Sequence, residues 1–249
     1  KSNLFYFKDY GTTNSPEYQN PYPIEITNCS FYIASNIDPN NSSNRKLSPP
    51  KITFINTQTN NSKSLIKFSS CRFLPLNVSN SKSNYWYNLQ FEISGSRALF
   101  EECEFFGLTS EMFVLFDIKD SSQVQFANSN FSEMSLELAH AIQISDSNLT
   151  LNQTRVTLSS FSGDFVRIQG LESSCTVLNS QITGNEIEIN GSFFHIPNQQ
   201  GKYSSWSMKF LKIEDSLVIN NRISEDSTCL RFGEGDVTIS NTSFIENKG

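Results

Sequence analysis

The chain has 249 residues, a formal net charge of −6 and a pI near 5.0, and only 18% of its residues are charged. Nucleic acid is excluded as an expected partner, because phosphate binding needs clustered Lys and Arg and this chain has no basic run. No apolar segment approaches the ~20 residues that span a bilayer. The 21 Phe residues argue against disorder, and the abundance of Asn and Ser favours strands closed by polar turns.

Residues 1–23 form the first segment, which does not contain the repeat found further along. An apolar run from Leu4 to Phe7 precedes Gly11 and a polar stretch. We expect the segment to cap the first coil, or to act as an arm that adds a strand to a neighbouring protomer. The chain starts at Lys1 without Met or a signal-peptide pattern. It ends directly after a repeat, which indicates a processed protein, a piece of a longer one, or a protomer whose end a neighbour covers.

From residue 24 onward an eight-residue phrase recurs eight times: apolar, x, apolar, x, a polar turn residue, a small residue, x and a bulky apolar residue. Its copies begin at Ile24, Ile66, Ala98, Val124, Leu149, Cys175, Leu211 and Val237. The turn position holds Asn28, Ser70, Glu102, Asn128, Gln153, Asn179, Asp215 and Asn241. The small position holds Cys29, Cys71, Cys103, Ser129, Thr154, Ser180, Ser216 and Thr242. The bulky position holds Phe31, Phe73, Phe105, Phe131, Val156, Ile182, Val218 and Phe244.

The spacing of these phrases predicts a solenoid. Successive turn positions lie 25 or 26 residues apart in four steps, and 32, 36 or 42 apart in the three steps that carry insertions. A period of this length, with apolar residues alternating along each phrase, is typical of strands stacked coil on coil. A second strand is expected midway between phrases, at Ile52–Phe54, Tyr87–Ile93, Phe113–Phe116, Ile142–Ile144, Phe165–Ile168, Phe193–Ile196 and Leu230–Phe232.

The three insertions, residues 36–50, 77–85 and 197–207, are expected to be surface loops. They are either surface insertions that the fold tolerates without a function, or binding surfaces. Binding is an alternative because long turns of a solenoid project from one face. Trp86 and Trp206 lie beside or within two of them. Exposed aromatic rings stack well on sugars, so both are candidate carbohydrate-binding residues.

The ends of three repeats carry a further motif. Phe244-Ile-Glu-Asn247 has the pattern Phe-x-x-Asn, and Ile182-Thr-Gly-Asn185 and Val218-Ile-Asn-Asn221 are looser versions of it. Together with the stacked phrases, this pattern resembles the right-handed parallel β-helix of the pectin-lyase-like superfamily, and within it the surface proteins with Phe-x-x-Asn repeats. The resemblance covers residues 24–249. It implies an extracellular or cell-surface protein with a structural or adhesive role, and in some relatives polysaccharide cleavage.

Three of the five cysteines, Cys29, Cys71 and Cys103, occupy the same repeat position on successive coils. Their Cα atoms would lie ~4.8 Å apart, which is within disulfide range. We expect either one bridge, Cys29–Cys71 or Cys71–Cys103, or a ladder of buried thiols. An odd number of cysteines leaves at least one thiol free in the monomer.

Ten Asn-x-Ser/Thr sequons are candidate N-glycosylation sites, if the chain passes through a eukaryotic secretory route. They are Asn28, Asn40, Asn41, Asn60, Asn77, Asn130, Asn148, Asn152, Asn190 and Asn241.

The residues that could carry chemistry form no recognised catalytic pattern. Asp117, Asp120, Asp146 and Asp164 are the densest carboxylates, but they do not share one repeat position, and Arg167 is the one nearby strand Arg. His140 and His195 are far apart in sequence, without the Cys spacing of a zinc site. A Ser-His-Asp triad lacks the Gly-x-Ser-x-Gly turn that would support it. We therefore predict no catalytic, cofactor-binding or metal-binding residues.

These observations predict an all-β chain: one right-handed parallel β-helix of about eight coils over residues 24–249, preceded by a cap or arm over residues 1–23. The expected function is non-enzymatic. The chain would be a stiff, glycosylated rod in an extracellular or cell-surface assembly, joining copies of itself end to end or binding other surface proteins. The alternatives are an adhesin that binds carbohydrate through its insertions, or a polysaccharide lyase or hydrolase.

Overall fold

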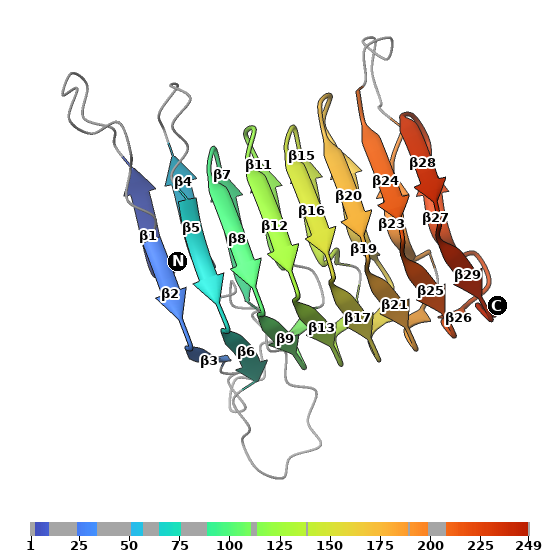
Figure 1. Cartoon of the computed structure of the whole chain (residues 1–249), viewed down its shortest axis with the longest axis horizontal. Coiled ribbons are helices and arrows are strands. Elements are labelled where there is room, and N and C mark those ends of the chain that lie inside the picture. The colour runs from blue at the N-terminus through green and yellow to red at the C-terminus, as the bar shows by residue number, and fades with distance from the viewer. Residues whose placement is uncertain are drawn as a thin grey trace, which may run out of the picture.

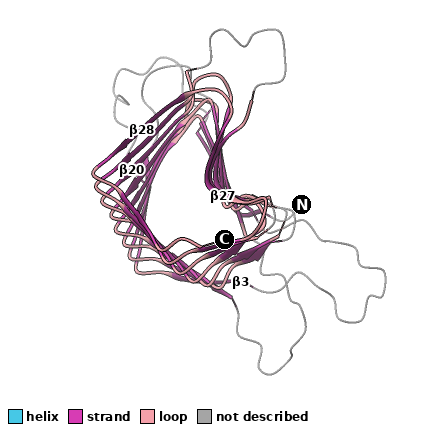
Figure 2. Cartoon of the chain, turned by 90° about the vertical axis from the view of Figure 1, so that its right-hand side faces the viewer, coloured by secondary structure: helices cyan, strands magenta, loops and turns pink. Residues whose placement is uncertain are grey.

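The computed structural model describes residues 3–9, 24–33, 51–56, 65–75, 89–110, 114–137, 139–188, 190–198 and 208–248. The described chain is built only of strands and turns, and every strand pairing within it is parallel. The strands stack along one axis, from blue at β1 to red at β29 (Figure 1). Viewed along this axis, each coil turns around a common interior (Figure 2). The chain is therefore a parallel β-helix, as the repeat predicts.

The described strands form four sheets, three of which run the length of the described helix. Sheet A holds β1 (Asn3–Asp9), β4 (Lys51–Asn56), β7 (Gln90–Ser94), β11 (Phe116–Lys119), β15 (Ile142–Ser145), β19 (Asp164–Gln169), β23 (Ser192–Ile196) and β27 (Thr228–Phe232). Sheet B holds β2 (Ile24–Thr27), β5 (Leu65–Ser69), β8 (Arg97–Glu101), β12 (Gln123–Ala127), β16 (Asn148–Asn152), β20 (Ser174–Leu178), β24 (Phe210–Glu214) and β28 (Asp236–Ser240).

Sheet C follows sheet B in each coil. It holds β3 (Ser30–Ile33), β6 (Arg72–Pro75), β9 (Glu104–Phe106), β13 (Asn130–Ser132), β17 (Arg155–Thr157), β21 (Gln181–Thr183), β25 (Leu217–Ile219) and β29 (Ser243–Ile245). The smaller sheet D holds β10 (Thr109–Ser110), β14 (Ser135–Leu136), β18 (Ser160–Phe161), β22 (Glu186–Ile187) and β26 (Arg222–Ile223). The sequence did not predict sheet D.

The repeat register is confirmed along the whole helix. Phrase starts lie side by side from Ile24 and Ile66 in β2 and β5 to Leu211 and Val237 in β24 and β28. The midway strands form sheet A, although the third of them begins at Phe116 and not at Phe113, which lies outside the described residues. β1 pairs in parallel with β4 of its own chain. Whether residues 1–23 act as a cap or as an arm stays a prediction.

The interior contains an aromatic ladder at the bulky repeat position. The rings of Phe31 and Phe73, Phe73 and Phe105, and Phe105 and Phe131 are stacked with centroids 4.8, 4.9 and 4.8 Å apart. Val156, Ile182 and Val218 continue the row and are buried. Each fully buried side chain of this size contributes roughly 1.5–3 kcal/mol relative to its exposed state, so this ladder supplies a continuous core.

The corner between sheets B and C depends on backbone conformation. All eight turn residues have a positive φ, between 47° and 54°. This left-handed region suits Asn and Asp better than other side chains, because a short polar side chain can bond locally. Glu102 and Gln153 adopt it with φ of 54° and 53°. The turn that the sequence predicts is therefore a tight left-handed corner in every coil.

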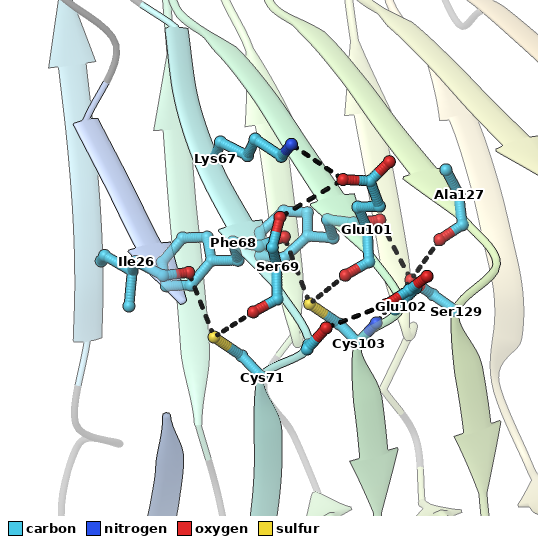
Figure 3. Close-up of polar contacts among 12 residues, drawn as sticks. Ile26, Lys67, Phe68, Ser69, Cys71, Glu101, Glu102, Cys103, Ala127 and Ser129 are labelled. Atoms are coloured by element: carbon cyan, nitrogen blue, oxygen red, sulfur yellow. Dashed lines mark hydrogen bonds and ion pairs between the residues drawn. The ribbon is translucent and has the colours of Figure 1, made fainter. Parts of the chain in front are cut away.

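The small residue after each corner forms a second ladder, which Figure 3 shows at Cys71, Cys103 and Ser129. Cys71 Sγ donates to the carbonyl oxygens of Ile26 (3.3 Å) and Ser69 (3.4 Å), and the Cys103 N–H donates to Ser129 Oγ at 3.1 Å. On later coils, as far as Thr242, the same repeat position holds a hydroxyl group that accepts the backbone N–H of the equivalent residue one coil earlier. Thiol or hydroxyl groups thus satisfy backbone groups that the bend leaves unpaired.

Candidate functional site

The four carboxylates singled out in the sequence do not form one cluster. Asp117 faces Lys119 at 3.6 Å, Asp120 accepts a bond from Ser94 at 2.5 Å, and Asp146 accepts the backbone N–H of Leu171 at 2.6 Å. These three bond locally. Within the described residues, no group of three or more His, Cys, Asp or Glu side chains is placed to hold a metal ion.

Asp164 is different, because it is the centre of a polar cluster on the outer side of sheet A. One carboxylate oxygen, Oδ1, accepts the hydroxyl of Ser192 at 2.6 Å. The other, Oδ2, lies 2.9 Å from His195 Nδ1 and 3.2 Å from Arg167 Nη1. It is also 3.4 Å from Nδ1 of His140. The side chain of Asp164 is only 3% exposed, so these contacts replace water around its charge.

Strand register assembles this cluster. Asp164 and Ser192 each open a strand of sheet A, and the pairing of β19 with β23 places them side by side. The same pairing places Arg167 beside His195. The chain packs tightly just before Asp164: a Cβ on Gly163 would lie 1.9 Å from the carbonyl oxygen of Ala139. Glycine at residue 163 therefore allows the approach that brings His140 to Asp164.

The two ionisable groups at the centre are shifted in pKa. Burial alone would raise the pKa of Asp164, but the hydrogen bonds from His195 and Ser192 and the nearby histidines outweigh it and lower the pKa of this carboxyl. Burial lowers the pKa of His140 to about 4, against the attraction of Asp164 and together with repulsion from Arg167 and His195. At neutral pH the cluster therefore holds an ionised Asp164 and a neutral His140.

A neutral His140 can accept a hydrogen bond through only one ring nitrogen. Its Nδ1 lies 3.1 Å from the backbone nitrogen of Asp164, and its Nε2 lies 3.3 Å from Arg167 Nη1. Both neighbours are donors, so the ring accepts from one of them at a time. His195 has a simpler role, because its Nδ1–H donates to Asp164 and its Nε2 is then left to face other groups.

A cavity of about 480 Å³ opens beside this cluster. Its lining includes Arg167, Gln169, His195, Asn198 and Lys209. Asp164 is not among the lining residues, so the cluster presents Arg167 and His195 to the cavity and keeps its carboxylate behind them. Among the lining residues that the structure describes there is no carboxylate, and the cations in the lining are Arg167, which is paired with Asp164, and Lys209.

This arrangement can bind an anion, and it can hold His195 in a fixed orientation to accept or donate a proton. It does not offer the serine as a nucleophile. Ser192 is fully buried, and its hydroxyl donates to Asp164 and not to a histidine. A triad would need the hydroxyl to face a base and a substrate.

The cysteines are free thiols in the structure. Burial raises the pKa of Cys71 and raises that of Cys103 to about 12, so the ladder consists of protonated, poorly nucleophilic thiols. A bridge such as Cys29–Cys71 or Cys71–Cys103 stays a prediction for an oxidising compartment.

The sequons differ in exposure. Asn28, Asn148, Asn190 and Asn241 are exposed, whereas Asn130 and Asn152 are partly buried. Asn40, Asn41, Asn60 and Asn77 lie outside the described residues, as do Trp86 and Trp206. The insertions at 36–50 and 77–85 lie there too, and of 197–207 only Pro197 and Asn198 are described before Met208.

The cluster around Asp164 was missed because His140 and His195 are 55 residues apart. One signal could have revealed part of it. Aligning the apolar residues of Phe165–Ile168 with those of Phe193–Ile196 puts Arg167 beside His195. His140 lies before β15 and outside any strand, so no alignment of strands would have placed it.

The described residues include no helix with the length and apolar character that crossing a bilayer requires. Comparison of the chain with protein-family models, with curated proteins and with solved structures finds no match in any of the three.

Proposed function

We propose that the chain is a non-enzymatic structural component of an extracellular or cell-surface assembly, a stiff rod built like the pectin-lyase-like β-helices. The observation that carries this proposal is the continuous parallel stacking of sheets A, B and C, each of which has eight strands in the described chain. Every coil is bonded to the next through parallel backbone pairing on several sides at once. Such a stack resists bending, because any bend must stretch hydrogen bonds in at least one sheet.

The proposed association of the rod with copies of itself concerns the last described coil. Phe232, Ile239 and Phe244 lie in register with Ile196, Ile213 and Val218. The latter three are buried, whereas the former are 52%, 42% and 38% exposed. They occupy interior repeat positions of the last described coil. A layer of parallel strands from a second copy would bury them and pair the edges of β27, β28 and β29.

Light scattering across a range of concentrations, with electron microscopy of the same samples, tests this self-association. We expect elongated oligomers whose mass rises with concentration. Ile239→Lys places a charge on the interior face of the end coil and should shift the chain to monomers. Ser240→Lys is the matched control, because Ser240 pairs with Glu214 on the outer face and should leave assembly intact. A wild-type chain that stays monomeric at every concentration overturns the proposal.

The exposed sequons support the proposed extracellular setting. A glycan on Asn190, an exposed turn residue, would project into solvent. Asn130 cannot carry one in this fold, because its Oδ1 is buried and its Nδ2 donates to Ser132 at 3.3 Å. Mass spectrometry of the chain secreted from eukaryotic cells should find glycan on Asn190 and none on Asn130. Secreted chain with unmodified Asn190, or with glycan on Asn130, would argue against this part of the proposal.

A further inference from the structure

The cavity beside Asp164 concentrates positive charge on an otherwise acidic chain. Arg167 and His195 come from adjacent, in-register strands β19 and β23, and Lys209 comes from the residue before β24. All three line the same cavity. With Asp164 kept behind Arg167 and His195, and with no carboxylate among the described lining residues, these side chains favour an anion in the cavity. The formal charge of −6 on the whole chain makes this local excess a specific feature of the cavity.

Lys209 is the residue that points most directly to an anion. The residue is only 2% exposed, and its Nζ donates to the carbonyl oxygen of Pro197 at 2.9 Å. Within the described part of the chain, no carboxylate lies within ion-pair distance of this ammonium group. A carbonyl does not neutralise a charge, and a buried ammonium without a counter-ion is costly. An anion in the cavity would supply the missing negative charge.

Arg167 has donors to spare. Its Nη1 is engaged with Asp164 and His140, and its Nε is enclosed, so the other guanidinium N–H groups are the ones that can face the cavity. A guanidinium has five N–H donors, so an oxyanion can bond it without displacing Asp164. His195 adds a further group: because its Nδ1–H donates to Asp164, its Nε2 is an acceptor in the neutral ring and donates to an oxyanion only in the imidazolium form. Donors on Arg167 and Lys209, joined by His195 as an imidazolium, suit an oxyanion with three terminal oxygens, such as a sulfate or phosphate ester, better than a planar carboxylate.

The rest of the cavity indicates which kind of molecule carries the ester group. A volume of about 480 Å³ is in the range of sites for small organic molecules and exceeds what one ion needs. The side-chain amides of Gln169 and Asn198 can donate to and accept from hydroxyl groups. Leu171 and Met208, which are 42% and 65% exposed, are joined by a backbone hydrogen bond next to lining residues Gly170 and Lys209. Polar donors with an apolar rim match the hydroxyls and C–H faces of a sugar.

We propose that this cavity binds a saccharide through a sulfate or phosphate ester, with Arg167, His195 and Lys209 as the oxyanion site. The ester oxygens lie among these three side chains. The hydroxyl groups of the sugar bond the amides, and its apolar face covers Leu171 and Met208. The site is independent of the ends of the rod, so it does not depend on the proposed self-association.

Isothermal titration calorimetry of the whole chain tests the proposal. The probes are the 6-sulfates and 6-phosphates of glucose, galactose and N-acetylglucosamine, the parent neutral sugars, and inorganic sulfate and phosphate. We expect at least one ester to bind, more tightly than either its neutral sugar or the free ion, and less tightly as NaCl is raised. Comparing the sulfate with the phosphate arm identifies the ester. No binding of any ester, or equal binding of the free ion and the ester, overturns the proposal.

Variants locate the site. Lys209→Met removes the charge and keeps the apolar stem, and should weaken ester binding at least about tenfold. The matched control is Lys212→Met, because Lys212 pairs with Glu214 on sheet B, outside the cavity, and the change in net charge is the same. If Lys209→Met fails to fold, Asn198→Asp provides the second test, because Asn198 is exposed and the new carboxylate would repel an anion. Unchanged binding in a folded variant of either kind overturns the assignment.

Discussion

The side-chain amide of Asn185 donates to Oδ1 of Asn221 at 3.0 Å, and Asn221 in turn donates to Oδ1 of Asn247 at 2.8 Å. Each of these Oδ1 atoms also accepts a backbone N–H from the coil before it. Asn185 and Asn221 are 2% and 1% exposed. The final residue of the Phe-x-x-Asn motif is therefore part of a buried amide ladder that runs parallel to the helix axis and holds the bend after sheet C.

Asn221→Ala should destabilise the chain strongly. The substitution removes the acceptor of the Asn185 N–H and the donor to the Ile182 carbonyl, and leaves these buried groups unsatisfied. Because each unsatisfied group costs about 1–3 kcal/mol, we expect a loss of about 3 kcal/mol in the free energy of unfolding. Urea denaturation followed by circular dichroism measures it. Gln181→Ala, on an exposed strand position, is the control and should change the free energy by less than about 0.5 kcal/mol.

A substitution at a corner should raise the free energy of unfolding. Gln153 adopts a φ of 53° at an exposed turn, a conformation that Asn tolerates better than Gln. Gln153→Asn should therefore raise the free energy of unfolding by about 0.5–1 kcal/mol. Gln123→Asn makes the same chemical change at an exposed position of β12, where Asn is a poor strand former, and should not stabilise. Equal effects at the two sites would show that the corner conformation is not the cause.

The fold was predictable from sequence because the repeat places chemically similar residues on neighbouring coils. The row from Phe31 to Phe131 and the eight left-handed corners follow from that periodicity alone. Sheet D was not predictable. Its strands, such as Thr109–Ser110 and Arg222–Ile223, have two residues each, which is too short for alternation to appear.

The candidate site was less predictable than the fold, because it depends on a turn. Arg167 and His195 are brought together by strand register, which the sequence encodes. His140 reaches Asp164 from a connection before β15, with Gly163 allowing the close approach. Lys209 lies after an insertion whose length is not set by the repeat. The repeat period does not predict where side chains at the ends of strands and in the connections lie.

The thiol ladder predicts a graded reactivity of the cysteines. Cys29 and Cys229 are partly exposed, whereas Cys71, Cys103 and Cys175 are buried. Burial raises the pKa of these three and raises that of Cys229 to about 11. Iodoacetamide at pH 8 should therefore alkylate Cys29 first in the native chain, and all five thiols once urea is added. Mass spectrometry of the peptides measures each site. Finding Cys71 bridged to Cys29 or Cys103 in secreted material would show that the disulfide alternative holds in that compartment.

His140 should make the chain sensitive to mild acid. It is packed against Asp164 and Arg167 of β19 and His195 of β23, and its pKa falls from 6.5 to about 4 on folding. Between these values the unfolded chain takes up a proton that the folded chain does not, so stability is full above pH 6.5 and declines as the pH falls toward 4. The shift corresponds to about 3 kcal/mol.

Asp164 acts in a lower pH range than His140. Its lowered pKa stabilises the fold above about pH 3.8, and this contribution is lost only at lower pH. His140→Gln should therefore flatten the stability profile between pH 6.5 and 4, measured by urea midpoints. Parallel profiles for the two proteins across the upper window would contradict the burial of a neutral His140.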